Sequence, residues 1–178
     1  MKEITYARAT TLGDATQRFK ASSEARYLSG GQTLIPVLKQ RLASPADVID
    51  LAGVPGLGGI AVTAQSVTIG AMVRHADVAA NDEVRQAIPA LAELAGGIGD
   101  PHVRNRGTLG GSVANSDPAA DYPAAVLALN ATITTNSGKH AADGFFKGLF
   151  ETALKDGEII TSVSFPKPEK AGYMKFRN

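Results

Sequence analysis

The sequence predicts an α+β fold with two lobes. The first 55 residues alternate short strand-like and helix-like stretches, which is typical of a small βαβ-like unit. The run Pro-Gly-Leu-Gly-Gly at 55–59 disrupts both helices and strands and so marks a boundary. Beyond it, β-leaning stretches separated by helical ones predict a mixed or antiparallel sheet with helices packed on it. We therefore expect lobes over residues 1–55 and 56–178.

Four elements are expected in the first lobe. Thr11 with Asp14 forms an N-cap pair that predicts a helix through residue 19. Residues 25–28 predict a strand that leads into a glycine pair, and Thr33 is placed to cap a helix through residue 39. Residues 46–51 predict a further strand.

In the second lobe, residues 60–62 and 67–69 flank a polar pair as in a hairpin. One helix is expected over 82–95 despite Pro89, and another over 121–129, because Pro123 is tolerated in a first helical turn. Three further stretches are β-leaning: 132–134, 159–165 and 173–176.

Composition limits the possible functions. The chain has 178 residues, 44% of them hydrophobic, with 18 basic and 17 acidic residues, so no bulk charge attracts it to nucleic acid or to an acidic membrane. It contains no cysteine, which excludes disulfides, thiolate-bound metals and cysteine-ligated clusters. Redox chemistry would then need an organic cofactor or a partner. No apolar run is long enough for a membrane span and no leader is visible, so a cytoplasmic protein without membrane insertion is expected.

Two glycine-containing segments are the main candidate site. Gly30-Gly31 lies between a predicted strand and a predicted helix, where backbone N–H groups favour a phosphate. Gly110-Gly111 is flanked by the hydroxyls of Thr108 and Ser112. Small residues let the backbone approach an anion closely, so these segments predict a phosphorylated cofactor.

Other sites are disfavoured. Neither a G-x-G-x-x-G dinucleotide fingerprint nor a P-loop is present, and the histidines at 75, 102 and 140 share no metal-ligand spacing. His75 is expected in a loop or at a helix start, and His140 in a surface strand. A triad of Ser112, His102 and Asp117 would lack the G-x-S-x-G turn that exposes a nucleophile. We predict no catalytic residue and no metal site in this chain.

The motifs together resemble those of a known family. Ser-Gly-Gly-Gln-Thr-Leu-Ile-Pro at 29–36, the run Gly-Asp-Pro-His-Val-Arg-Asn-Arg-Gly-Thr-Leu-Gly-Gly-Ser-Val-Ala-Asn at 99–115 and Asp-Pro-Ala-Ala-Asp-Tyr-Pro at 117–123 are similar to the flavin subunit of molybdenum hydroxylases. The resemblance is greatest to the medium subunit of carbon monoxide dehydrogenase-type enzymes and weaker to the flavin segment of xanthine dehydrogenase. It implies a two-lobed FAD-binding fold of the PCMH type.

The resemblance also implies which residues bind FAD. The backbones of residues 28–35 and 108–112 would hold the pyrophosphate between the lobes. Asp121 would bond a polar group of the ribityl or adenosine part, and Ile160 would contact the adenine end. Lys175 and Tyr173 would lie by the flavin. Ile98 would lie along the cofactor. The remaining implied cofactor residues are Leu28, Ser29, Gly30, Gly31, Gln32, Thr33, Leu34, Ile35, Thr108, Leu109, Gly110, Gly111, Ser112 and Asn115.

The chain departs from the family pattern in two places. Ser112 stands where relatives more often have asparagine or aspartate, which changes one side-chain donor and leaves the backbone unchanged. The sequence ends at Asn178, before the C-terminal domain of the family.

The resemblance implies an electron-transfer role. Electrons would pass from a molybdopterin-binding large subunit, through the [2Fe–2S] clusters of a small subunit, to FAD in this chain and on to an external acceptor. Two alternatives stay open: a self-sufficient FAD-dependent oxidoreductase with the vanillyl-alcohol-oxidase-like fold, and a flavin-free structural adaptor.

Overall fold

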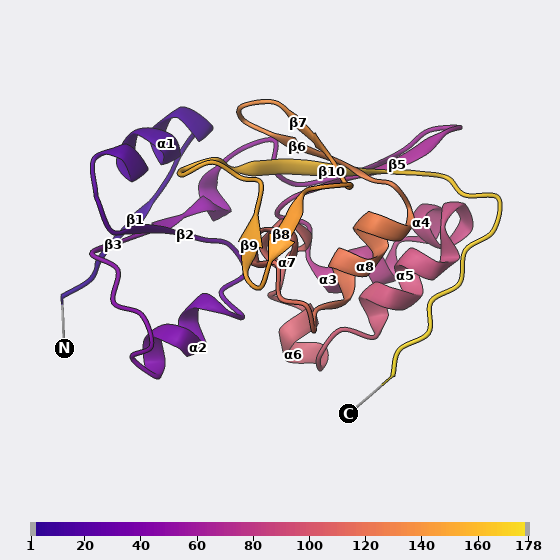
Figure 1. The fold of residues 1–178 in the computed structure, drawn as a ribbon, viewed down its shortest axis with the longest axis horizontal. Helices are drawn as coiled ribbons and strands as arrows, with labels where there is room; N and C mark the ends of the chain where they lie inside the picture. Colours follow the sequence, from indigo (N-terminus) through magenta and orange to yellow (C-terminus); the bar gives the residue numbers. More distant parts are fainter. Residues whose placement is uncertain (1–2, 177–178) are drawn as a thin grey trace.

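The computed structural model describes residues 3–176 and contains two main sheets (Figure 1). The first sheet has the strand order β1-β3-β2 and is parallel throughout. It lies in the N-terminal part of the chain, as the βαβ-like pattern predicted. Its strands are β1 (Thr5–Arg8), β2 (Ala25–Leu28) and β3 (Asp47–Asp50).

The helices of this part form where the sequence predicted them. In α1 (Leu12–Lys20) the Thr11 side chain accepts a hydrogen bond from the N–H of Asp14, at 3.0 Å. The helix α2 (Leu34–Lys39) also forms, but the predicted Thr33 cap is wrong, because that side chain caps none of the described N–H groups. Its φ of −108° and ψ of −53° are already helical, whereas a capping residue is normally extended.

The second sheet is antiparallel, with the order β4-β5-β10-β6-β7. The predicted hairpin is confirmed as the β4–β5 pair, and the strand expected near 159–165 is the long β10 in its centre. A separate hairpin, β8–β9, lies beside the sheet. The strands are β4 (Ile60–Val62), β5 (Ser66–Gly70), β6 (Thr132–Thr135), β7 (Lys139–Ala141), β8 (Phe146–Gly148), β9 (Glu151–Thr152) and β10 (Ile160–Pro166).

Helices cover one side of this sheet (Figure 1). The single helix expected over 82–95 is wrong, because the chain forms one helix up to Ala87 and another from Pro89. Proline lacks an N–H and disfavours a helical preceding residue, and Ile88 accordingly has φ −142° and ψ 79°. The helices are α3 (His75–Ala80), α4 (Asp82–Ala87), α5 (Pro89–Gly96), α6 (Pro101–Arg104), α7 (Leu109–Asn115) and α8 (Asp121–Ala128). None of the described helices is long and apolar enough to cross a bilayer.

The strand expected over 173–176 is also wrong. After β10 ends at Pro166, the chain leaves the sheet and runs past α5 and α8 without regular structure over its described residues (Figure 1). This C-terminal segment, residues 167–176, is held at its far end by side-chain contacts of Tyr173 and Lys175. A β-leaning composition was insufficient, because no strand edge is available at that place.

Two apolar cores pack the molecule. The larger core fills the space between the second sheet and its helices, and the smaller one lies in the N-terminal part. The smaller core also contains Leu57 and Ile159, which both follow the predicted boundary near residue 55 and lie about 100 residues apart in the sequence. The chain therefore crosses between the two parts more than once, and the division near residue 55 stays a prediction.

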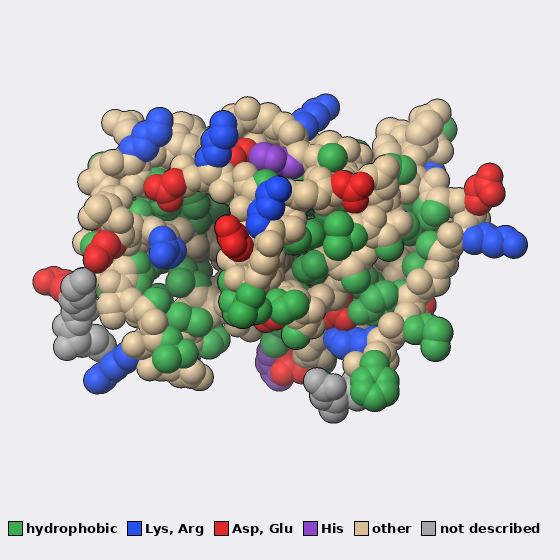
Figure 2. All heavy atoms as spheres, viewed as in Figure 1, with side chains coloured by type: hydrophobic (Ala, Val, Ile, Leu, Met, Phe, Trp, Pro, Cys, Tyr) green, Lys and Arg blue, Asp and Glu red, His purple; other side chains and the backbone are tan. Residues whose placement is uncertain are grey.

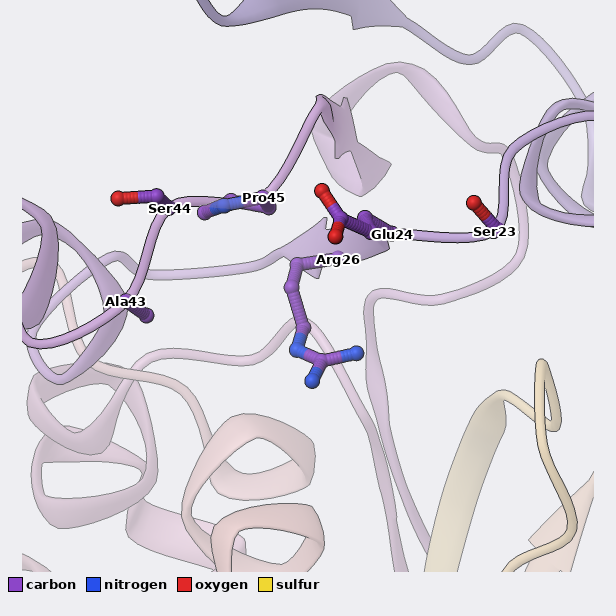
Figure 3. A pocket seen from close by; sticks show the side chains of 6 residues that line it. All are labelled: Ser23, Glu24, Arg26, Ala43, Ser44 and Pro45. Atoms are coloured by element: carbon purple, nitrogen blue, oxygen red, sulfur yellow. The ribbon is translucent and has the colours of Figure 1, made fainter. Parts of the chain in front are cut away.

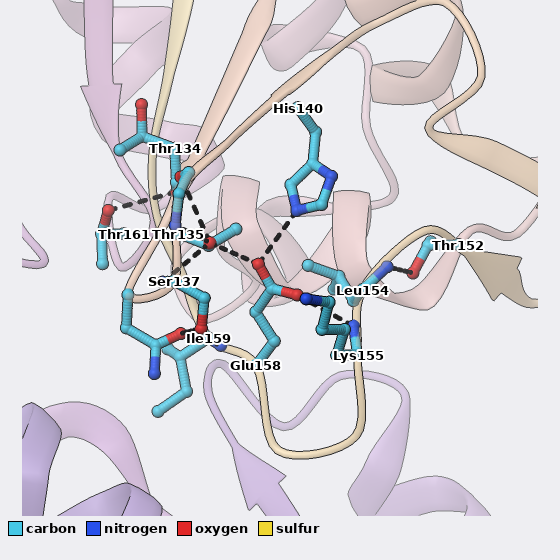
Figure 4. A network of polar contacts seen from close by, with 12 residues as sticks. Thr134, Thr135, Ser137, His140, Thr152, Leu154, Lys155, Glu158, Ile159 and Thr161 are labelled. Atoms are coloured by element: carbon cyan, nitrogen blue, oxygen red, sulfur yellow. Dashed lines mark hydrogen bonds and ion pairs between the residues drawn. The ribbon is translucent and has the colours of Figure 1, made fainter.

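A buried carboxylate joins three segments at the edge of the second sheet (Figure 4). Glu158 accepts hydrogen bonds from the Thr135 hydroxyl and from the N–H of Lys155, and its carboxylate lies 2.9 Å from Nε2 of His140. His140 is in a strand, as predicted, but its ring is partly buried in this network. Burial alone raises the pKa of Glu158, but these hydrogen bonds outweigh it and lower the pKa to about 2.

This network predicts an acid-sensitive stability. The folded pKa of Glu158 lies below its ordinary value of 4.5. Its contribution to the free energy of unfolding is therefore complete above pH 4.5 and is lost as the pH falls toward 2. The loss should amount to about 2–3 kcal/mol of unfolding free energy. Urea denaturation of Glu158→Gln between pH 2 and 7 should show a shallower pH dependence than the unchanged protein. Glu169→Gln, at an exposed position, is the matched control; equal slopes for all three proteins would contradict the assignment.

Candidate functional site

The second glycine-containing segment, at residues 107–111, is held by backbone hydrogen bonds to the stretch that links β5 to α3. The N–H of His75 donates to Gly107 O at 3.0 Å, that of Leu109 to Val73 O at 3.0 Å, and that of Gly110 to Ala71 O at 2.9 Å. A Cβ at Gly110 would lie 2.5 Å from the Cβ of Ala71. Gly110 is therefore a packing position, where the protein itself fills the space that a side chain would need.

The structure brings the two glycine-containing segments into contact although they are nearly 80 residues apart. The hydroxyls of Ser29 and Thr108 are 2.6 Å apart, and Ser29 also donates to Met72 Sδ at 3.0 Å. A Cβ on Gly30 would overlap the carbonyl group of Arg106. A Cβ on Gly111 would lie 2.9 Å from Thr108 Oγ1. A side chain at Gly30 would thus push the segments apart, and one at Gly111 would displace the Thr108 hydroxyl that contacts Ser29.

The two segments differ in their available hydrogen-bond donors. In the second segment, the N–H groups of residues 109–112 all donate to protein oxygens. In the first, the N–H groups of residues 30–33 donate to none of the residues between 3 and 176. Gly31 has a φ of +75°, which favours glycine. The first segment therefore presents the donors that a bound anion could use, and the second positions it.

A second cluster of predicted residues forms at the start of α8. Asp121 is buried and accepts hydrogen bonds from the Tyr173 hydroxyl and from Lys175 Nζ, the latter at 2.9 Å. Lys175 Nζ also lies 3.4 Å from Gly97 O, next to Ile98. Burial and the neighbouring Asp121 raise the pKa of Tyr173 to about 12. The structure thus brings together three residues that the resemblance assigned to the cofactor.

Two predicted residues lie elsewhere. Ile160 is buried in the larger core at the start of β10, and Asn115 is partly buried in the last turn of α7. The serine triad rejected from the sequence is not assembled around His102, whose ring is almost fully exposed and lies 3.6 Å from Asp100.

The sequence analysis missed a buried polar pair behind the second segment. His75 lies at the start of α3, which is one of the two placements predicted for it. It is only 4% exposed, and its ring packs on that of Tyr122 with the ring centroids 5.3 Å apart. The His75 Nδ1 atom and the Tyr122 hydroxyl are buried without a hydrogen-bond partner among the described residues. Burial lowers the pKa of His75 to about 4, although Asp121 acts in the opposite direction. Nothing in the local sequence indicates this burial.

The described surface has mixed charge and a hollow away from the glycine pair. Figure 2 shows basic and acidic side chains interspersed over one face, in agreement with the balanced charge. A shallow polar hollow near the start of β2 lies at the opposite end of that strand from the glycine pair (Figure 3). Its lining residues are Ser23, Glu24, Arg26, Ala43, Ser44 and Pro45.

Known proteins share this architecture. The chain is 39% identical over 168 residues to a glyceraldehyde dehydrogenase medium chain from Sulfolobus acidocaldarius, which covers 92% of this chain and 60% of that one. It is 39% identical over 178 residues to a nicotine 6-hydroxylase medium subunit from Paenarthrobacter nicotinovorans, covering 97% and 63%. The chain thus spans about 60% of the length of these relatives.

The structural comparison agrees with the sequence comparison. A carbon monoxide dehydrogenase from Hydrogenophaga pseudoflava superimposes with a TM-score of 0.88 at 36% identity, over 93% of this chain and 59% of that one. The family model described as "FAD binding domain in molybdopterin dehydrogenase" matches residues 2–168. This match confirms the FAD prediction and the fold prediction at the level of the family. The chain belongs to the FAD-binding domain family of the molybdopterin dehydrogenases.

Proposed function

We propose that this chain is the FAD-binding, electron-transferring part of a molybdenum hydroxylase. The contact between the two glycine-containing segments carries the proposal, because beside it lies a partly exposed stretch of backbone N–H groups, at residues 30–33, that no described residue accepts from. Such a stretch suits a pyrophosphate, whose oxygens accept several hydrogen bonds at once. When bound, FAD supplies reversible electron transfer, and the protein supplies binding, orientation and electrostatics.

In this proposal the two segments have different roles. The N–H groups of residues 30–33 bond the pyrophosphate oxygens, and the Ser112 hydroxyl is the side-chain donor that the resemblance adds. The Ser29 and Thr108 hydroxyls bond each other and hold the two segments together. Residues 106–108 keep the first segment in place, because the carbonyl group of Arg106 lies against Gly30 and the Thr108 hydroxyl bonds Ser29. Leu28, Leu34 and Ile35 flank the first segment and complete this part of the proposed site.

The cluster around Asp121 serves the remaining polar parts of the cofactor. Asp121 accepts a hydrogen bond from a hydroxyl of the ribityl or adenosine part, and Lys175 contributes positive charge beside the flavin. Tyr173 and Ile98 lie next to these two groups in the fold. Ile160 and Asn115 are assigned from the resemblance alone.

Two partner chains complete the proposed system. The described chain has no cysteine with which to hold an iron–sulfur cluster. We propose that a [2Fe–2S] chain delivers electrons from a molybdopterin-binding chain, and that this chain passes them to an external acceptor. The cytoplasmic location stays a prediction of the sequence.

Substitution of Gly30 tests the proposed phosphate site. Gly30→Ala adds a Cβ against the carbonyl group of Arg106, separates the segments and should weaken FAD binding at least about tenfold, or about 1.4 kcal/mol. Flavin fluorescence titration measures this change. Gly58→Ala is the matched control, because a Cβ there meets nothing within 4 Å. Equal FAD affinity for both variants would contradict the site, and no binding by the unchanged chain would favour the adaptor alternative.

Asp121→Asn tests the cluster at the start of α8. It removes the charge that Lys175 and Tyr173 contact, and because Lys175 is partly exposed the loss of unfolding free energy should be modest, about 1–2 kcal/mol. FAD affinity should fall as well, whereas Lys175→Met should weaken FAD binding with a smaller loss of stability. Asp143→Asn, at an exposed position, is the control. Unchanged FAD titrations of both cluster variants would remove these residues from the site.

The requirement for partners is tested by metal analysis and reduction. The isolated chain, reconstituted with FAD, should contain neither iron nor molybdenum and should not be reduced by a substrate of its relatives, such as glyceraldehyde or nicotine. The complete complex should contain both metals and reduce its flavin with its substrate. Flavin bleaching of the isolated chain by a small substrate would support the self-sufficient oxidoreductase instead.

A further inference from the structure

His75 connects three elements that carry the proposed cofactor residues. Its backbone N–H bonds Gly107 O, its ring packs on Tyr122, and Tyr122 directly follows Asp121 in α8. A Cβ on Gly107 would lie 2.6 Å from Nε2 and 2.8 Å from Cδ2 of the His75 ring. The edge of the imidazole therefore lies directly against the backbone of Gly107.

The ring is a costly choice for a purely structural position. Its Nδ1 atom is buried without a partner among residues 3–176, as is the hydroxyl of the adjoining Tyr122. Leaving a buried polar atom unpaired is unfavourable, and replacing it with an apolar group of similar size is often neutral or stabilising. A leucine of similar volume would thus serve the core better than this histidine.

We propose that His75 is a positioning residue for the cofactor site, which sets the separation between the glycine-containing segment at 107–111 and Asp121. This inference rests on the proposed FAD function. The imidazole is planar, so its edge lets the α-carbon of Gly107 approach closely, while the ring of Tyr122 packs against it at an interplanar angle of 45°. A branched aliphatic side chain is thicker in the same direction and displaces Gly107, together with the Thr108 hydroxyl that contacts Ser29.

Stability and FAD affinity should respond in opposite ways. His75→Leu removes an unpaired polar atom, so its thermal midpoint without FAD should be unchanged or higher, whereas its Kd for FAD should rise at least about tenfold. His75→Gln reaches the same place with a planar amide and should recover most of the affinity. His75→Asn is too short to reach Gly107 and should not.

Tyr122→Phe is the matched control. It removes the other unpaired polar atom of the same ring contact and keeps the ring, whereas the side-chain atoms nearest to a Cβ on Gly107 are those of His75. Its thermal midpoint should rise and its FAD affinity should stay unchanged. If Leu and Asn at position 75 bind FAD as well as the unchanged protein, the inference is overturned; should the Leu variant not fold, the contrast between Gln and Asn decides alone.

A measurement without FAD separates this inference from the proposed function. The backbone amide resonances of Gly107, Gly110 and Gly111 should shift in His75→Leu and His75→Asn and stay near their positions in Tyr122→Phe. Shifts in the absence of any FAD binding by the unchanged chain would show that His75 places Gly107 while the proposed cofactor function fails. Unshifted glycine resonances with intact FAD binding would reject the positioning role and leave the cofactor site unaffected.

Discussion

The pairing of residues 107–110 with the chain at 71–75 is the constraint on which the site depends. It is formed by backbone hydrogen bonds at His75, Leu109 and Gly110, and it is possible because glycine leaves the needed space at 107 and 110. α7 starts from this paired segment, and the contact between Thr108 and Ser29 joins the segment after β2 to the start of α7. One short backbone pairing therefore determines where the two glycine-containing segments meet.

The two glycine-containing segments look alike in sequence but differ in chemistry. A glycine that allows two backbone segments to approach and a glycine that lies beside a ligand cannot be distinguished from the sequence, since both positions require a missing side chain. They differ in where the N–H groups donate. The segment at 109–112 satisfies its donors within the protein, as buried backbone normally does, whereas the exposed segment at 30–33 leaves its donors available.

The cluster at Asp121 shows how the C-terminal segment is retained without a strand. A carboxylate that is largely removed from water needs partners, and Tyr173 and Lys175 supply them from a stretch that pairs with no described strand. Because the ammonium group of Lys175 is partly exposed, the pair avoids the full cost of burying two charges. The same groups lie near the turn that carries Ile98, so one contact both anchors the segment and gathers the residues proposed for the flavin.

The sequence by itself determined the elements with strong local signals. Three features depend only on residues that are close together in the sequence, so a short stretch is enough to predict them. They are the Thr11 cap, the β4–β5 hairpin and the glycine-containing motifs that indicate the family. Only the tertiary structure decided that residues 173–176 form no strand, that Gly110 packs on Ala71, and that His75 is buried against Tyr122. These features depend on which segments, distant in the sequence, pack together. That packing, and no local sequence pattern, determines which groups are buried and which hydrogen bonds they form.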